Sequence, residues 1–284
     1  MANAAPRLPT DLERRILELT AELYPDCTST LVLLAHRTYI WLEPYLYRHL
    51  ALYKPGVRAA FAKAAAAAKP PSFFLLGPRR VDFPLIPPQD EELDALALCT
   101  GVQDVMIPSC SPDGPRILAT LGMMSIRRMC IPVNELMPQP KPLDGKHLAF
   151  RLVSHLDLHD PIHVIEERLP NFLINLPQLT HLALHEIVRS DTLDLILQKC
   201  KKLQLLVFLM RDIRDQPDFD RIFQRAVING RCTIKLAPQR SYRLDAIFVE
   251  EESISSYWHI PAALSGRRKR HAIAPASIYY PVLS

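Results

Sequence analysis

The segments Val81-Asp82-Phe83-Pro84, Val105-Met106-Ile107-Pro108 and Met129-Cys130-Ile131-Pro132 repeat one pattern at intervals of 24 residues. Each segment reads apolar, variable, apolar, proline. Alternation with a period of two is typical of a β-strand with one buried face, and a proline cannot donate a hydrogen bond to a continuing strand. The three segments therefore predict three short strands, each of which ends at its proline.

The same register continues along the chain at intervals of 24 to 28 residues. Further strands are expected at Leu156-x-Leu158, Leu182-x-Leu184, Leu206-x-Phe208 and Ile234-x-Leu236. Helical stretches between the strands are expected at residues 91–98, 116–123, 162–176, 192–199 and 219–228. One strand and one helix in roughly 20–29 residues is typical of leucine-rich repeats.

The sequence thus predicts an α/β fold in which residues 51–238 form an irregular leucine-rich-repeat solenoid, with parallel concave strands and outer helices. The alternative is a compact, doubly wound α/β sheet whose strand–helix units have a similar length. Equal spacing favours the solenoid, because stacked repeats require it and a doubly wound sheet does not.

Composition and motifs exclude several classes of function. The chain of 284 residues has only 8 glycines, and it lacks the glycine-rich phosphate loops, the G-x-S-x-G motif and the H-E-x-x-H motif. Its six cysteines include no C-x-x-C pair. We therefore expect no enzymatic activity, no cofactor and no metal-ligand motif.

Charge and hydropathy limit the kinds of partner and the cellular location that can be expected. The net charge of +4 is nearly balanced, so nucleic acid is not expected as the main partner, and the longest apolar run, residues 205–210, is too short to span a membrane. Without a signal peptide, the protein is expected in the cytoplasm or the nucleus. The basic run at residues 267–270 fits either a nuclear-import signal or ordinary solvated surface.

Residues 1–50 follow a different, helical pattern. Leu12, Ile16, Leu19 and Leu23 recur at helical spacing and form one apolar stripe. Thr10, followed three residues later by Glu13, predicts a capping box at the start of this helix. A second helix is expected over residues 28–42, before Pro44.

Three stretches of this region carry a family resemblance: Leu8-Pro9-x-x-Leu12-x-x-x-Ile16-Leu17, Leu31-Val32-Leu33-Leu34-Ala35-His36-Arg37 and Trp41-Leu42-Glu43-Pro44-Tyr45-Leu46-Tyr47-Arg48-His49-Leu50. Together they resemble an F-box, as found in the F-box-like proteins with degenerate leucine-rich repeats that are abundant in mushroom-forming fungi. The motif covers residues 8–50, and the repeats extend the resemblance to about residue 238.

The resemblance implies a non-enzymatic substrate receptor of an SCF-type cullin–RING ubiquitin ligase. Its N-terminal helices would bind the adaptor subunit of the ligase, and its repeats would present an unknown protein substrate. The adaptor-facing residues implied by position are Leu8, Pro9, Leu12, Ile16, Leu31, Leu34 and Trp41. The alternative is a protein-interaction scaffold in which these helices only cap the N-terminal end of the solenoid.

Histidines flank the predicted core leucines of two neighbouring strands. Alternation directs His155, Asp157 and His159 to the concave face of one strand, and His181 and His185 to the same face of the next. Strands lie roughly 4.8 Å apart, so His155 should neighbour His181, and His159 should neighbour His185. We expect a pH-sensitive recognition patch that loses affinity or stability as the pH falls. Solvated polar surface is the simpler alternative, and a bridging zinc ion has no fixed ligand spacing to support it.

The next strand is apolar on both sides. Leu205, Val207 and Leu209 are expected on the concave face, where an exposed apolar patch would be uncommon for a soluble protein. Residues 239–284 carry several large apolar side chains, including Ile247, Phe248 and Trp258. We expect this tail to fold back over the patch. The alternative is that the patch itself binds a partner.

Overall fold

The computed structural model describes residues 8–67, 69–84, 90–109, 113–138, 142–210 and 233–238, with Met210 and residues 233–238 described by their backbone alone. The chain divides into two compact units, Met1–Arg240 and Ser241–Ser284. All described residues belong to the first unit. The expected helix at residues 219–228, the tail at residues 239–284 and the basic run at residues 267–270 lie outside the described residues.

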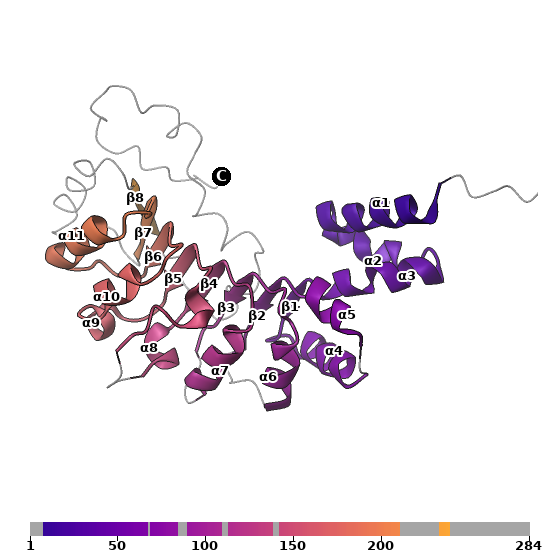
Figure 1. The fold of residues 1–284 in the computed structure, drawn as a ribbon, viewed down its shortest axis with the longest axis horizontal. Coiled ribbons are helices and arrows are strands. Elements are labelled where there is room, and N and C mark those ends of the chain that lie inside the picture. The colour runs from indigo at the N-terminus through magenta and orange to yellow at the C-terminus, as the bar shows by residue number, and fades with distance from the viewer. Residues whose placement is uncertain are drawn as a thin grey trace, which may run out of the picture. The chain divides into compact units, whose positions relative to one another are not determined.

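In the described part of the chain, eight strands form one parallel sheet, and their order in the sheet is their order in the sequence (Figure 1). The strands are β1 (His49–Ala51), β2 (Arg80–Asp82), β3 (Asp104–Met106), β4 (Arg128–Ile131), β5 (His155–Leu158), β6 (His181–Leu184), β7 (Leu205–Met210) and β8 (Thr233–Pro238). The seven strands predicted from the repeated pattern are confirmed as β2 to β8. The additional strand β1 begins the sheet two residues before the expected boundary at residue 51.

A recurring hydrogen-bond arrangement starts the strands. One backbone carbonyl of each repeat accepts hydrogen bonds from two successive backbone N–H groups of the next repeat, at 2.7–3.1 Å. The accepting carbonyls belong to Arg48, Arg79, Gln103, Arg127, Ser154 and Thr180. This shared geometry keeps all neighbouring strands in the same register, so equivalent side chains form rows across the sheet.

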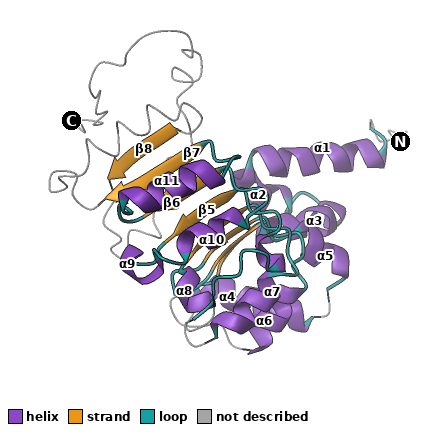
Figure 2. Cartoon of the chain, turned by 60° about the vertical axis from the view of Figure 1, so that its left-hand side comes forward, coloured by secondary structure: helices purple, strands orange, loops and turns teal. Residues whose placement is uncertain are grey.

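The helices between the strands lie on one side of the sheet, as both views show for α6 to α11 (Figure 1, Figure 2). They are α4 (Pro55–Ala66), α5 (Pro71–Leu76), α6 (Asp90–Ala97), α7 (Gly114–Leu121), α8 (Val133–Leu136), α9 (Ile162–Ile165), α10 (Leu169–Ile174) and α11 (Ser190–Lys199), with a 3₁₀ turn η3 (Leu148–Phe150). Parallel strands in sequence order require this arrangement, because their crossover connections are right-handed.

One expected helix is divided. Residues 162–176 form the two short helices α9 and α10 instead of one. Pro170 lies in the first turn of α10, where its missing N–H costs nothing, whereas inside a longer helix it would remove a hydrogen bond. The prediction of a single helix was wrong because it ignored this proline.

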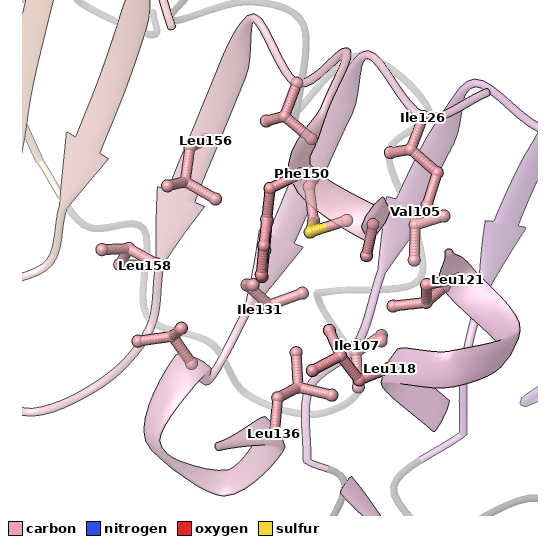
Figure 3. Close-up of a cluster of buried hydrophobic side chains, with 14 of the residues drawn as sticks. Val105, Ile107, Leu118, Leu121, Ile126, Ile131, Leu136, Phe150, Leu156 and Leu158 are labelled. Atoms are coloured by element: carbon pink, nitrogen blue, oxygen red, sulfur yellow. The ribbon is translucent and has the colours of Figure 1, made fainter. Parts of the chain in front are cut away.

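The hydrophobic core lies between the sheet and these helices. It is one cluster of buried side chains that extends from Leu50 to Phe208. It consists of the inward residues of the strands, such as Leu156 and Leu158, and of the apolar faces of the helices (Figure 3). Phe150 is fully buried within it. The other side of the sheet is thereby left to a different set of side chains.

The N-terminal helices form a small cluster of their own. They are α1 (Thr10–Leu23), a 3₁₀ turn η1 (Pro25–Cys27), α2 (Thr28–Leu31), α3 (His36–Leu42) and a 3₁₀ turn η2 (Glu43–Tyr47). Their core consists of Ala21, Val32 and Leu42, with partly buried residues around it. No helix within the described ranges is long and apolar enough to cross a membrane.

Two sequence predictions in this cluster were wrong. The expected helix over residues 28–42 is interrupted before Ala35, whose backbone is extended. The Thr38 hydroxyl accepts a hydrogen bond from the Ala35 N–H at 3.0 Å and donates one to the Ala35 carbonyl at 2.7 Å. Thr10 is not an N-cap, because α1 starts one residue earlier than expected and Pro9 precedes its first turn. Glu13 therefore makes no capping box and instead pairs with Arg37 at 2.7 Å.

Candidate functional site

The N-terminal helices present an exposed apolar surface. Leu12, Ile16, Leu19 and Leu23 are 49, 50, 39 and 71% exposed and lie at helical spacing on one side of α1. We call these four residues the α1 stripe. Large apolar side chains in such a row are uncommon on a surface without a partner, and they mark a candidate binding site.

The seven residues implied to face an adaptor divide into two groups. Leu8, Pro9, Leu12, Ile16 and Leu34 are exposed, and Leu34 reaches 64%. Leu31 and Trp41 are half-buried and pack against the small core of the helical cluster. The structure thus brings the exposed five to the surface, whereas Leu31 and Trp41 help to hold the helices together. Leu33, which is 82% exposed, was not singled out from the sequence.

The helical cluster contacts the sheet domain through η2 rather than through the α1 stripe. Tyr47 of η2 packs edge-to-face on Phe73 of α5, with ring centroids 5.0 Å apart. Lys69 donates a hydrogen bond to the carboxylate of Glu43 at 2.8 Å. The α1 stripe consequently stays available while the cluster is attached.

The side of the sheet opposite the helices carries polar side chains, which we call the polar face. It consists of His49, Arg80, Asp82, Asp104, Arg128, Cys130, His155, Asp157 and His181. Neighbouring strands pair their charges: Arg128 donates two hydrogen bonds to Asp104, at 2.5 and 2.6 Å, and Asp82 contacts both Arg80 and His49. These pairs were not predicted from the sequence, although the 24-residue register aligns Asp104 with Arg128.

The predicted neighbours His155 and His181 are confirmed as cross-strand partners. Their rings stack with centroids 4.1 Å apart and planes 10° from parallel. Each Nδ1 atom lies at hydrogen-bond distance from the preceding hydroxyl group, of Ser154 at 2.9 Å and of Thr180 at 2.8 Å. Burial lowers the pKa of His155 to about 4, helped by the charges of His181 and Arg128, and burial also lowers the pKa of His181.

A pH dependence of stability follows from this stack. The folded protein favours neutral imidazoles, whereas in the unfolded chain they take up protons near pH 6.5. The contribution of the neutral histidine stack to the free energy of unfolding is thus complete above about pH 6.5 and is lost as the pH falls toward about 4. We expect the free energy of unfolding, measured by urea denaturation with a chelator present, to fall over this range. His155→Gln should make that fall shallower, and equal slopes for both proteins would contradict the prediction.

A second group of side chains lies at the carboxyl ends of β4, β5 and β6. His159 and His185 are also neighbours as predicted, with ring centroids 4.5 Å apart. Between the strands, the carboxylate of the buried Asp157 lies 3.0 Å from Nε2 of His185 and 3.7 Å from Nε2 of His159. Burial alone would raise the pKa of Asp157, but the two imidazoles hold this pKa well below its ordinary value.

Cys130 also belongs to this group, although it was not predicted from the sequence. Its Sγ atom lies 2.8 Å from Nε2 of His159 and 3.5 Å from Oδ2 of Asp157. Burial, with the nearby negative charge of Asp157, raises the pKa of this thiol well above its ordinary value. The missed signal was the alternation of β4, which directs Cys130 to the same side as Arg128, in register with Asp157.

The predicted apolar patch is not exposed. Leu205, Val207 and Leu209 of β7 are all buried. Burial of these three side chains was expected, together with a tail that covers them, and it disfavours the alternative in which they form an exposed partner site. The tail that was expected to cover them lies outside the described residues.

Comparison of the sequence with models of known protein families and with curated proteins found no match.

Proposed function

We propose that this protein is a non-enzymatic recognition subunit. Its N-terminal helices dock, in the manner of an F-box, on the adaptor subunit of a cullin–RING ubiquitin ligase. Its parallel-sheet body is an irregular leucine-rich-repeat solenoid that presents a protein substrate. The observation that carries the proposal is the exposure of the α1 stripe on helices that already have a core of their own.

The attachment of the helices supports docking over simple capping. A capping unit would turn its main apolar surface toward the first repeat, to cover the end of the core. Here η2 makes that contact through Tyr47, and the α1 stripe remains 39–71% exposed. The scaffold alternative rests on the same η2 contacts, because they tie the helices to the sheet whether or not an adaptor binds.

The sheet supports the solenoid over a doubly wound fold. A doubly wound sheet reverses its strand order at a switch point and carries helices on both faces. The order β1 to β8 has no reversal, and α6 to α11 lie on one side (Figure 2). A sheet of this kind leaves its other face to side chains that can contact a partner, as repeat proteins use theirs.

The test is direct binding of the full chain to the purified ligase adaptor, measured by calorimetry. The double variant Leu12→Ala/Ile16→Ala should weaken binding strongly, since each central apolar anchor contributes about 2 kcal/mol, or about 30-fold. Its melting temperature should change little, because both side chains are half exposed. Leu195→Ala, which removes a similarly exposed leucine from α11, is the matched control and should bind normally.

Two results would reject adaptor docking. One is a wild-type chain that is folded but does not bind the adaptor. The other is unchanged binding by Leu12→Ala/Ile16→Ala. Either result would leave the scaffold function, for which partners should be retained by the sheet domain when the α1 stripe is altered.

A further inference from the structure

Four side chains with metal-binding atoms lie close together near the carboxyl ends of the neighbouring strands β4, β5 and β6. They are Cys130 of β4, Asp157 of β5, His159 just after β5 and His185 just after β6. Three neighbouring repeats supply them, and the shared register brings them together although they span 56 positions of the chain. The ligand atoms of Cys130, Asp157 and His159 all lie within 4.8 Å of one another.

From this juxtaposition we infer that Cys130, Asp157, His159 and His185 form a binding site for Zn²⁺. The inference is independent of adaptor docking, since the site lies on the sheet. Cys130, Asp157 and His159 supply one sulfur, one oxygen and one nitrogen ligand atom that lie close together. His185, whose Nε2 atom lies 3.0 Å from Oδ1 of Asp157, is the proposed fourth of the four ligands that zinc prefers. Calcium and magnesium prefer all-oxygen sites, so the thiol and the two imidazoles select a transition metal.

The ligand atoms of Cys130, Asp157 and His159 have a spacing close to that of ligands around a tetrahedral ion. Zinc bonds of about 2.0–2.3 Å place neighbouring ligand atoms about 3.3–3.7 Å apart. The Cys130 Sγ to Asp157 Oδ2 distance is 3.5 Å, and the His159 Nε2 to Asp157 Oδ2 distance is 3.7 Å. The Cys130 Sγ to His159 Nε2 distance of 2.8 Å has to open by less than about 1 Å.

Charge and burial also favour a divalent cation. Cys130 and Asp157 are 5 and 2% exposed, whereas the side chain of His159 keeps 19% of its surface in solvent and gives an entry path. A thiolate and a carboxylate carry two negative charges, so one Zn²⁺ makes the buried group neutral. Binding replaces the thiol proton of Cys130, which leaves to solvent, and the two imidazoles bind in their neutral form.

The competing explanation is a metal-independent hydrogen-bond network of the same four side chains. Titration of the chelator-treated full chain with Co²⁺ distinguishes the two. A site with a thiolate ligand should give a sulfur-to-cobalt charge-transfer band, saturate at one equivalent and release the cobalt when Zn²⁺ is added. Zn²⁺ should also raise the melting temperature of the protein.

Substitutions of the proposed ligands test which residues bind the metal. Cys130→Ser and His159→Gln should each weaken binding by at least about 100-fold, since loss of even an outer partner of a ligand costs about 10–100-fold. Cys200→Ser is the matched control, a half-buried thiol next to the core on a later repeat, and should keep the cobalt spectrum. Circular dichroism checks folding, and His185→Gln provides another ligand variant should Cys130→Ser fail to fold.

Two outcomes would overturn the inference. The first is a folded wild-type chain that gives no charge-transfer band and no thermal shift with Zn²⁺. The second is an unchanged cobalt spectrum in the folded ligand variants, which would place the metal elsewhere.

Discussion

Phe150→Ala is expected to lower the free energy of unfolding by about 3–5 kcal/mol, one of the two largest effects predicted for a single substitution in this chain. The Phe150 ring is fully buried in the core between the sheet and the helices (Figure 3). It packs edge-to-face on Phe172 of α10, with centroids 5.2 Å apart and planes 87° apart. Removing it leaves a cavity and also ends an aromatic contact between two repeats.

The control for this substitution lies two residues away. Leu148 belongs to the same 3₁₀ turn but is 61% exposed. Leu148→Ala should therefore change the free energy of unfolding by less than about 0.5 kcal/mol. Urea denaturation followed by circular dichroism measures both values. Similar losses for the two variants would show that η3 does not hold Phe150 in the core.

Gly101→Ala is expected to lower the free energy of unfolding by about 3 kcal/mol, at the upper end of overpacking effects. A Cβ atom at Gly101 would lie 2.0 Å from the backbone carbonyl oxygen of Leu75, the penultimate residue of α5. A backbone atom cannot rotate away as a flexible side chain can, so the two repeats would have to separate. Arg79 also donates a hydrogen bond to the Gly101 carbonyl at 2.9 Å, which restrains this turn further.

The same substitution at Gly56 should have the opposite sign. Gly56 lies in α4, and a Cβ atom there would meet nothing within 4 Å. Gly56→Ala should therefore raise the free energy of unfolding by about 0.5 kcal/mol, because alanine favours the helix and restricts the unfolded chain. Thermal melts of the two variants side by side test both signs. A stabilised Gly101→Ala would contradict the close approach of the two repeats.

The strands could be predicted because their signal is periodic. Residues such as Val81, Val105 and Met129 recur at a constant interval, and the sheet keeps that interval as its register. Strand β1 was missed because Leu50 pairs with Val81, which follows 31 residues later, outside the 24–28 range. The longer interval holds two helices, α4 and α5, in place of one.

Helix ends were harder to predict because single local interactions decide them. The helix expected over residues 28–42 ends at Leu31 and starts again at His36, where the Thr38 hydroxyl bonds to the Ala35 backbone, and a proline divides another expected helix. Neither effect changes the apolar pattern from which the helices were inferred. Hydrophobic periodicity thus located the helical stretches in the sequence but not the points at which they are interrupted.

In the candidate sites, too, the contacts that follow from the strand register could be predicted, whereas those that depend on three-dimensional packing could not. Cross-strand pairs such as His155 with His181 follow from the register alone. The contact of Cys130 with His159 was missed because the cysteines were examined only for C-x-x-C spacing along the sequence. Exposure of Leu12 and burial of Val207 depend on what covers each surface in three dimensions, and an apolar stripe in a sequence does not specify its cover.

The strand order has a consequence for biosynthesis. Among the strands that the structure describes, each one hydrogen-bonds only to the strands immediately before and after it in the sequence. A chain leaving the ribosome therefore needs no residue still to be translated in order to extend the sheet: every new strand finds its partner already in place. The sheet can grow one strand at a time during translation, and each growing edge is paired as soon as the next strand forms, which limits the interval in which that edge is open to aggregation.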